Sequence, residues 1–178
     1  MCLRDESDDG GSVQDAKVKD NSGTVQTGKV EKWSLAKRIL PFFRKRIAVL
    51  VDGPNILRKE FNVKLEEILE AVKSLGKVQV ARVYLNQHAS EKLIEAISNS
   101  GFEPIISTID VHLKMAMDSV ELTNKLELDY IAIASRHARC VPILHKLKEK
   151  NLGTAVIGFE PGFSVALQNT ADYVFKLT

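Results

Sequence analysis

The sequence predicts an α/β fold with a mostly parallel central sheet. Short apolar segments alternate with longer ones whose apolar residues recur every three or four positions, as in βαβ units. The segment 47–51, IAVLV, is uniformly apolar, which is typical of a parallel strand buried on both faces. Gly76 and Gly101 follow the first two helical segments, where glycine commonly ends a helix. These three patterns predict one domain over residues 47–178.

The first half of this domain alternates strand, helix, strand and helix. After a strand at 47–52, Gly53–Pro54 is expected to form a turn. Residues 78–85 are the second strand. A helix at 63–75 has the apolar face Val63, Leu65, Ile68, Leu69, Val72 and Leu75. A helix at 90–100 has the inner face Leu93, Ile94 and Ile97.

The second half continues the same alternation. We expect strands at 103–107, 130–134, 154–158 and 173–177. We expect helices at 111–126, 141–150 and 164–169. Because a helix separates successive strands, the connections are crossovers, which join parallel strands.

The residues before this domain differ from it in composition. Residues 1–28 are polar, with almost no large apolar side chains, and are predicted to be a disordered tail. Residues 29–46 combine aromatic and aliphatic side chains with lysine and arginine, and we call them the basic-aromatic arm. The part from 33 to 46 could dock on the domain as a helix, lie on an anionic membrane surface, contact another protein or follow a nucleic-acid backbone. The sequence leaves these uses open, and it leaves a homodimer open too.

Charge and composition exclude several classes of protein. The net charge is +2, and residues 47–178 hold 15 basic and 16 acidic side chains, so a nucleic-acid site in the domain would be a local patch. No stretch approaches the roughly 18 apolar residues of a transmembrane helix, and no signal-peptide pattern is present. The two cysteines, Cys2 and Cys140, do not suggest a disulfide framework. We therefore expect a cytoplasmic protein.

Two polar residues follow the apolar run of the first strand. Asp52 ends the strand and Asn55 lies three residues later. Ligands of open α/β sheets bind outside the carboxyl ends of the strands, and burying unpaired polar groups is costly. The pattern therefore favours a functional crevice here, although an aspartate can also simply cap a turn. The phosphate loops GxxxxGK[ST] and GxGxxG are absent, and Pro54 stands where an aspartate-based phosphotransferase has its second carboxylate.

Three segments in order resemble the NYN domain, a branch of the PIN-like nuclease fold. They are VDGPN at 51–55, VHLKMAMD at 111–118 and ASRHARCVPIL at 134–144. The stretches 86–106 and 157–177 are similar to an archaeal group of uncharacterised NYN proteins related to the LabA proteins. The resemblance implies a PIN-like three-layer sandwich. It also implies acidic residues that hold Mg²⁺ or Mn²⁺ for the cleavage of RNA, because these ions prefer oxygen ligands and stabilise the reacting phosphate.

Only part of the implied acidic site is present. The resemblance assigns catalytic roles to Asp52, Asn55 and Asp118, and metal ligation to Asp52, Asp118 and His112. His112 stands where the family has an aspartate, and Asp110 lies two residues before it as a partial substitute.

The third segment departs further. Its two family acids fall on His137 and Arg139, and the aromatic residue that follows them is Cys140. Arginine cannot ligate a metal, and imidazole suits zinc, iron or copper better than Mg²⁺. The sequence therefore predicts a partly lost acidic metal site.

Two other uses of the crevice stay open. Asp52, His112 and His137 could bind a softer ion, although the histidines could simply hydrogen-bond to Asp52 or solvent. Alternatively, cationic side chains could hold a phosphate without metal, and we expect the substrate-binding residues Arg58, Arg136, His137 and Arg139, with His112 beside them.

The sequence thus predicts an NYN protein of RNA metabolism that resembles metal-dependent endoribonucleases. The alternative is a non-catalytic module that binds RNA or a nucleotide phosphate, and a third interpretation is an interaction protein that uses the arm. The expected partner is RNA. The cofactor is Mg²⁺ or Mn²⁺ if the site is active, or none, and whether the protein is an enzyme stays open.

Overall fold

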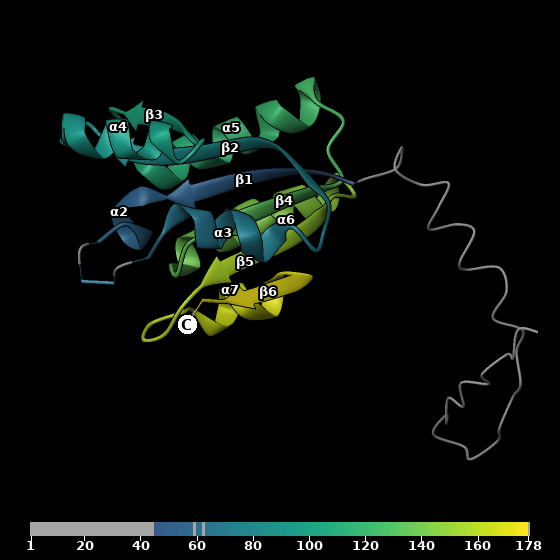
Figure 1. The fold of residues 1–178 in the computed structure, drawn as a ribbon. Coiled ribbons are helices and arrows are strands. Elements are labelled where there is room, and N and C mark those ends of the chain that lie inside the picture. Colours follow the sequence, from purple (N-terminus) through teal and green to yellow (C-terminus); the bar gives the residue numbers. More distant parts are fainter. Residues whose placement is uncertain (1–44, 59, 62, 178) are drawn as a thin grey trace, which may run out of the picture. The chain divides into compact units, whose positions relative to one another are not determined.

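Six parallel strands form the centre of the structure, a computed structural model that describes residues 45–58, 60–61 and 63–177 (Figure 1). The strands are β1 (Arg46–Asp52), β2 (Lys77–Asn86), β3 (Glu103–Ser107), β4 (Tyr130–Ala134), β5 (Gly153–Gly158) and β6 (Tyr173–Lys176). Their order in the sheet is β3-β2-β1-β4-β5-β6, and every neighbouring pair is parallel. The predicted α/β class and parallel sheet are confirmed.

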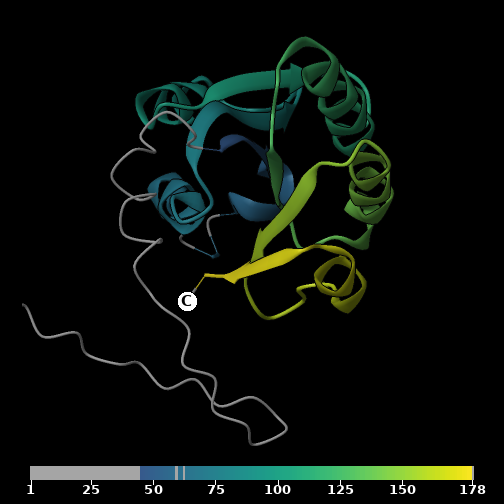
Figure 2. The ribbon, with the colours of Figure 1, turned by 90° about the vertical axis from the view of Figure 1, so that its right-hand side faces the viewer.

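Helices cover both faces of the sheet (Figure 2). Helices α3 (Leu65–Val72) and α4 (Glu91–Asn99) pack on one face. Helices α5 (Val111–Lys125), α6 (Val141–Glu149) and α7 (Val165–Thr170) pack on the other. The three-layer arrangement that we expected is therefore present.

Side chains of β1 alternate between the two cores. Ile47, Val49 and Val51 join the core under α3 and α4, whereas Ala48 and Leu50 join the core under α5, α6 and α7. Since successive side chains of a strand point to opposite faces, Asp52 continues the row of Ala48 and Leu50. The fold thus directs the Asp52 carboxylate toward α5 and α6.

The turn predicted at Gly53–Pro54 is wrong. These residues begin a one-turn helix, α2 (Gly53–Ile56), which the Leu57 N–H closes by donating to the Gly53 carbonyl at 2.8 Å. Proline fits the first turn because its φ is already helical and the missing N–H would have no partner there. Glycine is required at position 53, because a Cβ atom would lie 2.6 Å from the Tyr84 carbonyl oxygen.

The tail and residues 29–44 of the arm lie outside the described residues. The last residue of the predicted arm, Arg46, begins β1, and its N–H donates to Asp129 Oδ2 at 2.6 Å. Within the described residues, no helix is both long enough and apolar enough to cross a membrane. The remaining expected helices and strands are present, with ends that differ by up to three residues.

Candidate functional site between β1 and β4

After each of the two central strands, β1 and β4, the chain continues toward a different side of the sheet. From β1 the chain continues to β2 and β3 on one side, and from β4 it continues to β5 and β6 on the other. In open α/β sheets this switch point creates a crevice outside the carboxyl ends of the two strands. Val51 pairs with Ala134, so Asp52 and Ser135, the next residues along each strand direction, meet at this crevice.

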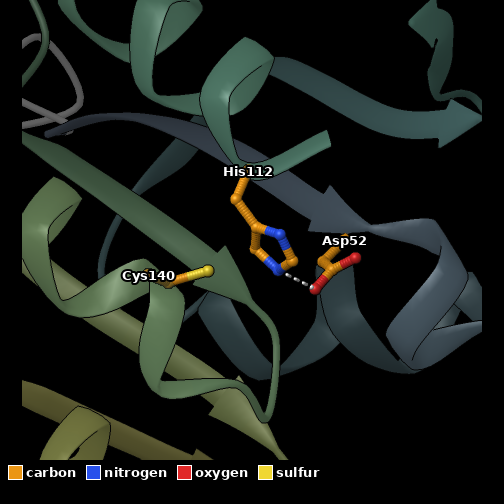
Figure 3. Close-up of side chains that lie close together, drawn as sticks. All are labelled: Asp52, His112 and Cys140. Atoms are coloured by element: carbon orange, nitrogen blue, oxygen red, sulfur yellow. Dashed lines mark hydrogen bonds and ion pairs between the residues drawn. The ribbon is translucent and has the colours of Figure 1, made fainter. Parts of the chain in front are cut away.

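The Asp52 carboxylate is almost completely buried, with 1% of the residue exposed. One of its oxygens, Oδ2, accepts a hydrogen bond from Ser135 Oγ at 2.9 Å. The same oxygen lies 3.0 Å from His112 Nε2 (Figure 3). These two contacts offset much of the cost of burying a carboxylate.

His112 lies in the first turn of α5, and Asp110 caps this helix. The Asp110 carboxylate accepts from the N–H groups of His112 and Leu113 at 2.9 and 3.1 Å, and the bond from Leu113 is the main reason that its pKa is lowered. Asp110 Oδ1 also lies 3.5 Å from His112 Nδ1. The hydrogen bond to Asp52 raises the pKa of His112 despite its partial burial. The imidazole therefore lies between two carboxylates that favour its protonated form.

Cys140 is a third side chain of this group, and our sequence analysis did not assign it to the site. It lies in η2 (Ala138–Cys140), a 3₁₀ turn that leads into α6. Its sulfur, the Asp52 carboxylate and the His112 imidazole have one donor atom each within 4.8 Å of one another. Burial raises the pKa of the Cys140 thiol to about 12, so the free side chain is a thiol. The three residues can together hold a metal ion.

His137 and Arg139 lie at the mouth of the crevice. Both are exposed, and the His137 N–H donates to Ser135 Oγ at 3.2 Å. The His137 ring meets the His112 ring edge-on, with centroids 5.9 Å apart. The Arg139 guanidinium lies 3.4 Å from Asp110 Oδ2, an exposed pair that contributes little stability. The crevice rim therefore carries cationic and imidazole groups.

Asn55 and Arg136 hold the neighbouring loops together. Asn55 is buried, and its Oδ1 accepts from the Arg136 N–H at 2.8 Å. The Arg136 guanidinium stacks on Phe61 and Phe159, 4.1 and 4.6 Å from the ring centroids, and donates to the Pro161 carbonyl at 2.6 Å. The structure thus places the Arg136 side chain in a packing contact next to the crevice.

Arg58 lies just after α2 and is exposed. Its Nε donates to the Pro54 carbonyl at 3.1 Å. The structure therefore does not bring Arg58 into contact with Asp52, His112 or Cys140.

Asp118 is also buried but belongs to a different group. It pairs with Lys114 at 2.5 Å and with Arg82 at 3.7 Å. It is six residues from His112, which on a helix corresponds to about 9 Å of rise and about 120° of rotation away from the His112 side. Of the three predicted metal ligands, the structure brings together Asp52 and His112 and leaves Asp118 in an ion-paired cluster.

Ser135 is a second site residue that the sequence analysis missed. Its oxygen contacts both Asp52 and the His137 N–H. One sequence signal points to it, since it directly follows the apolar strand 130–134. Polar residues after central strands are the usual crevice residues.

Comparison with known proteins identifies the family of this chain. The family model of the NYN domain matches residues 46–178. An uncharacterised protein of the archaeon Methanocaldococcus jannaschii is 49% identical over 162 residues, which cover 88% of this chain and 67% of that protein. A crystal structure of a Vibrio parahaemolyticus protein of unknown function has a similar fold, with a TM-score of 0.67 and 17% identity over 76% of this chain and 94% of that chain. The chain therefore belongs to the NYN domain family, within the PIN-like nucleases.

Proposed function

We propose that this protein binds RNA at the crevice between β1 and β4 without the Mg²⁺- or Mn²⁺-dependent cleavage that its family implies. The observation that carries the proposal is the set of groups around Asp52. This carboxylate contacts His112 and Ser135, and its neighbours at the crevice mouth are His137 and Arg139. A histidine or an arginine thus stands where the family resemblance implies acids.

The side chains present do not suit Mg²⁺. This ion requires near-octahedral oxygen coordination, and carboxylates usually supply its protein ligands. In the group formed by Asp52, His112 and Cys140, only Asp52 offers oxygen. The second predicted acid, Asp118, is paired with two cations. A two-metal site that stabilises both reacting oxygens of a phosphate has too few ligands here.

The same substitutions make the crevice attractive to an RNA phosphate. Arg139 is exposed, and its surface pair with Asp110 is weak enough to be exchanged for a phosphate oxygen. The hydrogen bond to Asp52 raises the pKa of His112 and so favours the protonated imidazole in the crevice. Since the domain as a whole is close to neutral, this local patch is where the backbone of RNA would be held.

A binding experiment tests the RNA part of the proposal. A labelled single-stranded RNA is titrated with the full chain at several salt concentrations, and Arg139→Asp is compared with Lys92→Asp. Lys92 is an exposed cation on α4, outside the crevice, so both variants change the net charge equally. We expect salt-sensitive binding that Arg139→Asp weakens about tenfold and Lys92→Asp much less, because only Arg139 would contact the RNA. Equal losses in the two variants would contradict binding at the crevice.

A cleavage experiment tests the catalytic part. The natural chain, Asp52→Asn and the triple variant His112→Asp, His137→Asp, Arg139→Asp are incubated with single-stranded RNA and Mg²⁺ or Mn²⁺. We expect cleavage only by the triple variant, in which carboxylates return to the metal positions. If the natural chain cuts and Asp52→Asn does not, the natural site is an active nuclease and the proposal is wrong.

Three further predictions come from the sequence and concern location, assembly and partners. A cytoplasmic location, a homodimer and contacts made through residues 33–46 each need an experiment of their own. Residues 33–44 of that segment lie outside the described part of the chain.

A further inference from the structure

We propose that Asp52, His112 and Cys140, joined by His137 from the crevice mouth, form a binding site for Zn²⁺ or an ion of similar softness. The site occupies the same crevice as the proposed RNA contact, but its existence does not depend on RNA binding.

The three donors come from separate parts of the chain. Asp52 ends β1, His112 begins α5, and Cys140 lies in the 3₁₀ turn after β4. Figure 3 shows the Cys140 sulfur and the Asp52 carboxylate both directed toward the His112 ring. The fold thus brings one oxygen, one nitrogen and one sulfur donor to a single point, all within 4.8 Å.

The spacing of these atoms is close to that of a tetrahedral zinc site. With Zn–N and Zn–O distances of about 2.0–2.2 Å and Zn–S of about 2.3 Å, neighbouring ligand atoms lie about 3.3–3.6 Å apart. The Asp52 and His112 donor atoms are 3.0 Å apart, and the widest separation in the group does not exceed 4.8 Å. The widest separation between donor atoms would have to shorten by about 1 Å to reach tetrahedral geometry. A rotation of the Cys140 side chain could move its sulfur by that amount.

Contacts behind the donors match those of known metal sites. A metal-bound histidine usually donates its second ring N–H to a carboxylate, which fixes the ring. Here His112 Nδ1 is buried without a hydrogen bond among the described residues and lies 3.5 Å from Asp110 Oδ1. Ser135 Oγ holds the Asp52 carboxylate from the other side. With an ion on His112 Nε2, the ring proton would lie on Nδ1, beside the Asp110 carboxylate that would accept it.

The donor types determine which ion fits. Thiolate and imidazole select zinc and neighbouring transition metals over Mg²⁺, Ca²⁺ or Mn²⁺. Zinc displaces the proton of a cysteine thiol when it binds, so a buried thiol such as Cys140 can still become a ligand. His137, whose ring lies 5.9 Å from that of His112, is placed to supply the fourth ligand by rotating inward.

The experiment uses Co²⁺ as a spectroscopic substitute for Zn²⁺. The full chain is stripped of metal with a chelator, kept reduced and titrated with Co²⁺. We expect one equivalent to bind with a thiolate-to-cobalt charge-transfer band in the near ultraviolet and the visible bands of tetrahedral cobalt, and Zn²⁺ to abolish both. Absence of the thiolate band in the natural chain would overturn the proposal.

Matched variants identify the ligands. Cys140→Ser should lose the thiolate band, whereas Cys2→Ser, which changes the only other cysteine, should retain it. His112→Gln should lose binding, and Asp110→Asn should weaken it about tenfold as expected for a supporting carboxylate. His145→Ala changes an exposed histidine outside the crevice and should have no effect.

Each other outcome contradicts part or all of the proposal. A thiolate band that depends on Cys2, or that survives in Cys140→Ser, would place the ion elsewhere. His137→Ala that binds Co²⁺ as tightly as the natural chain would remove His137 from the ligand set. Circular dichroism of each metal-free variant shows whether it is folded. If Cys140→Ser does not fold, Cys140→Ala replaces it in the experiment. RNA binding measured with and without Zn²⁺ keeps the two proposals separate, since either can fail while the other holds.

Discussion

Asp52 and Asp118 are both carboxylates at positions where the family resemblance implies acids, and both are almost completely buried, with 1% and 3% of the residue exposed. Their partners differ. Asp118 pairs with a lysine and an arginine, Lys114 and Arg82. Asp52 contacts His112 and Ser135 and lies near a thiol, groups that can exchange a proton or accept a metal.

Burial alone therefore does not distinguish the two carboxylates, whereas their partners do. The two cations at Asp118 occupy its oxygens, so this residue stabilises the contact between α5 and β2. The partners of Asp52 can lose a proton or bind a metal ion, and they lie at the edge of the sheet where ligands of such folds bind. We therefore expect changes at Asp118 to alter stability and changes around Asp52 to alter binding.

The largest effect on stability should come from Asp118→Asn. This substitution keeps the shape but removes a buried charge that two cations contact, so we expect a loss of about 2–3 kcal/mol in the free energy of unfolding. Urea unfolding measures the loss, and Co²⁺ binding should stay unchanged in the folded protein. Asp52→Asn should show the opposite pattern, with lost Co²⁺ binding and a smaller change in stability. Equal behaviour of the two variants would remove the distinction between the two regions.

A smaller effect should appear in the pH dependence of the metal-free protein. The pKa of His112 is raised in the folded state, so its contribution to stability is fully present below the unfolded pKa of about 6.5 and is lost as the pH rises through the folded pKa. The natural chain should therefore exceed His112→Gln in stability by about 1–2 kcal/mol near pH 6, and the gap should narrow at higher pH. A gap that widens with pH would contradict a charged His112 paired with Asp52.

The smallest effect should come from the Ser135 hydroxyl. Ser135→Ala removes a hydrogen bond to a buried carboxylate, and we expect a loss of about 1 kcal/mol in the free energy of unfolding together with weaker Co²⁺ binding. Ser119→Ala is the control, because Ser119 is equally buried and donates only to a carbonyl within α5, where alanine favours the helix. If both variants lose the same stability and neither changes Co²⁺ binding, Ser135 has no role in the crevice.

The sequence predicted the fold well because the apolar pattern of each element is local. The run 47–51 and the apolar faces of the helices were sufficient for the parallel sheet, and the family resemblance implied the three layers. The apolar pattern also led to Asp52, which ends the first strand, whereas the family resemblance led to His112.

The other site residues could not be assigned from the sequence, because their roles depend on contacts between segments that are distant along the chain. Cys140 and Ser135 meet Asp52 only because β1 and β4 lie side by side in the sheet. The packing role of Arg136 depends on Phe61 and Phe159, which are distant from it in sequence. The motif did not show that Asp118 lies away from His112, because both the rise and the rotation of α5 separate the two residues.

We propose that the crevice binds ions that prefer nitrogen and sulfur ligands instead of hard cations such as Mg²⁺. Thermal unfolding with added metal tests it directly, since an ion that binds only the folded state raises the melting temperature. The natural chain should be stabilised by micromolar Zn²⁺ and unaffected by millimolar Mg²⁺ or Mn²⁺. The triple variant His112→Asp, His137→Asp, Arg139→Asp should respond to Mn²⁺ instead. Stabilisation of the natural chain by Mg²⁺ or Mn²⁺, with no response to Zn²⁺, would contradict the account.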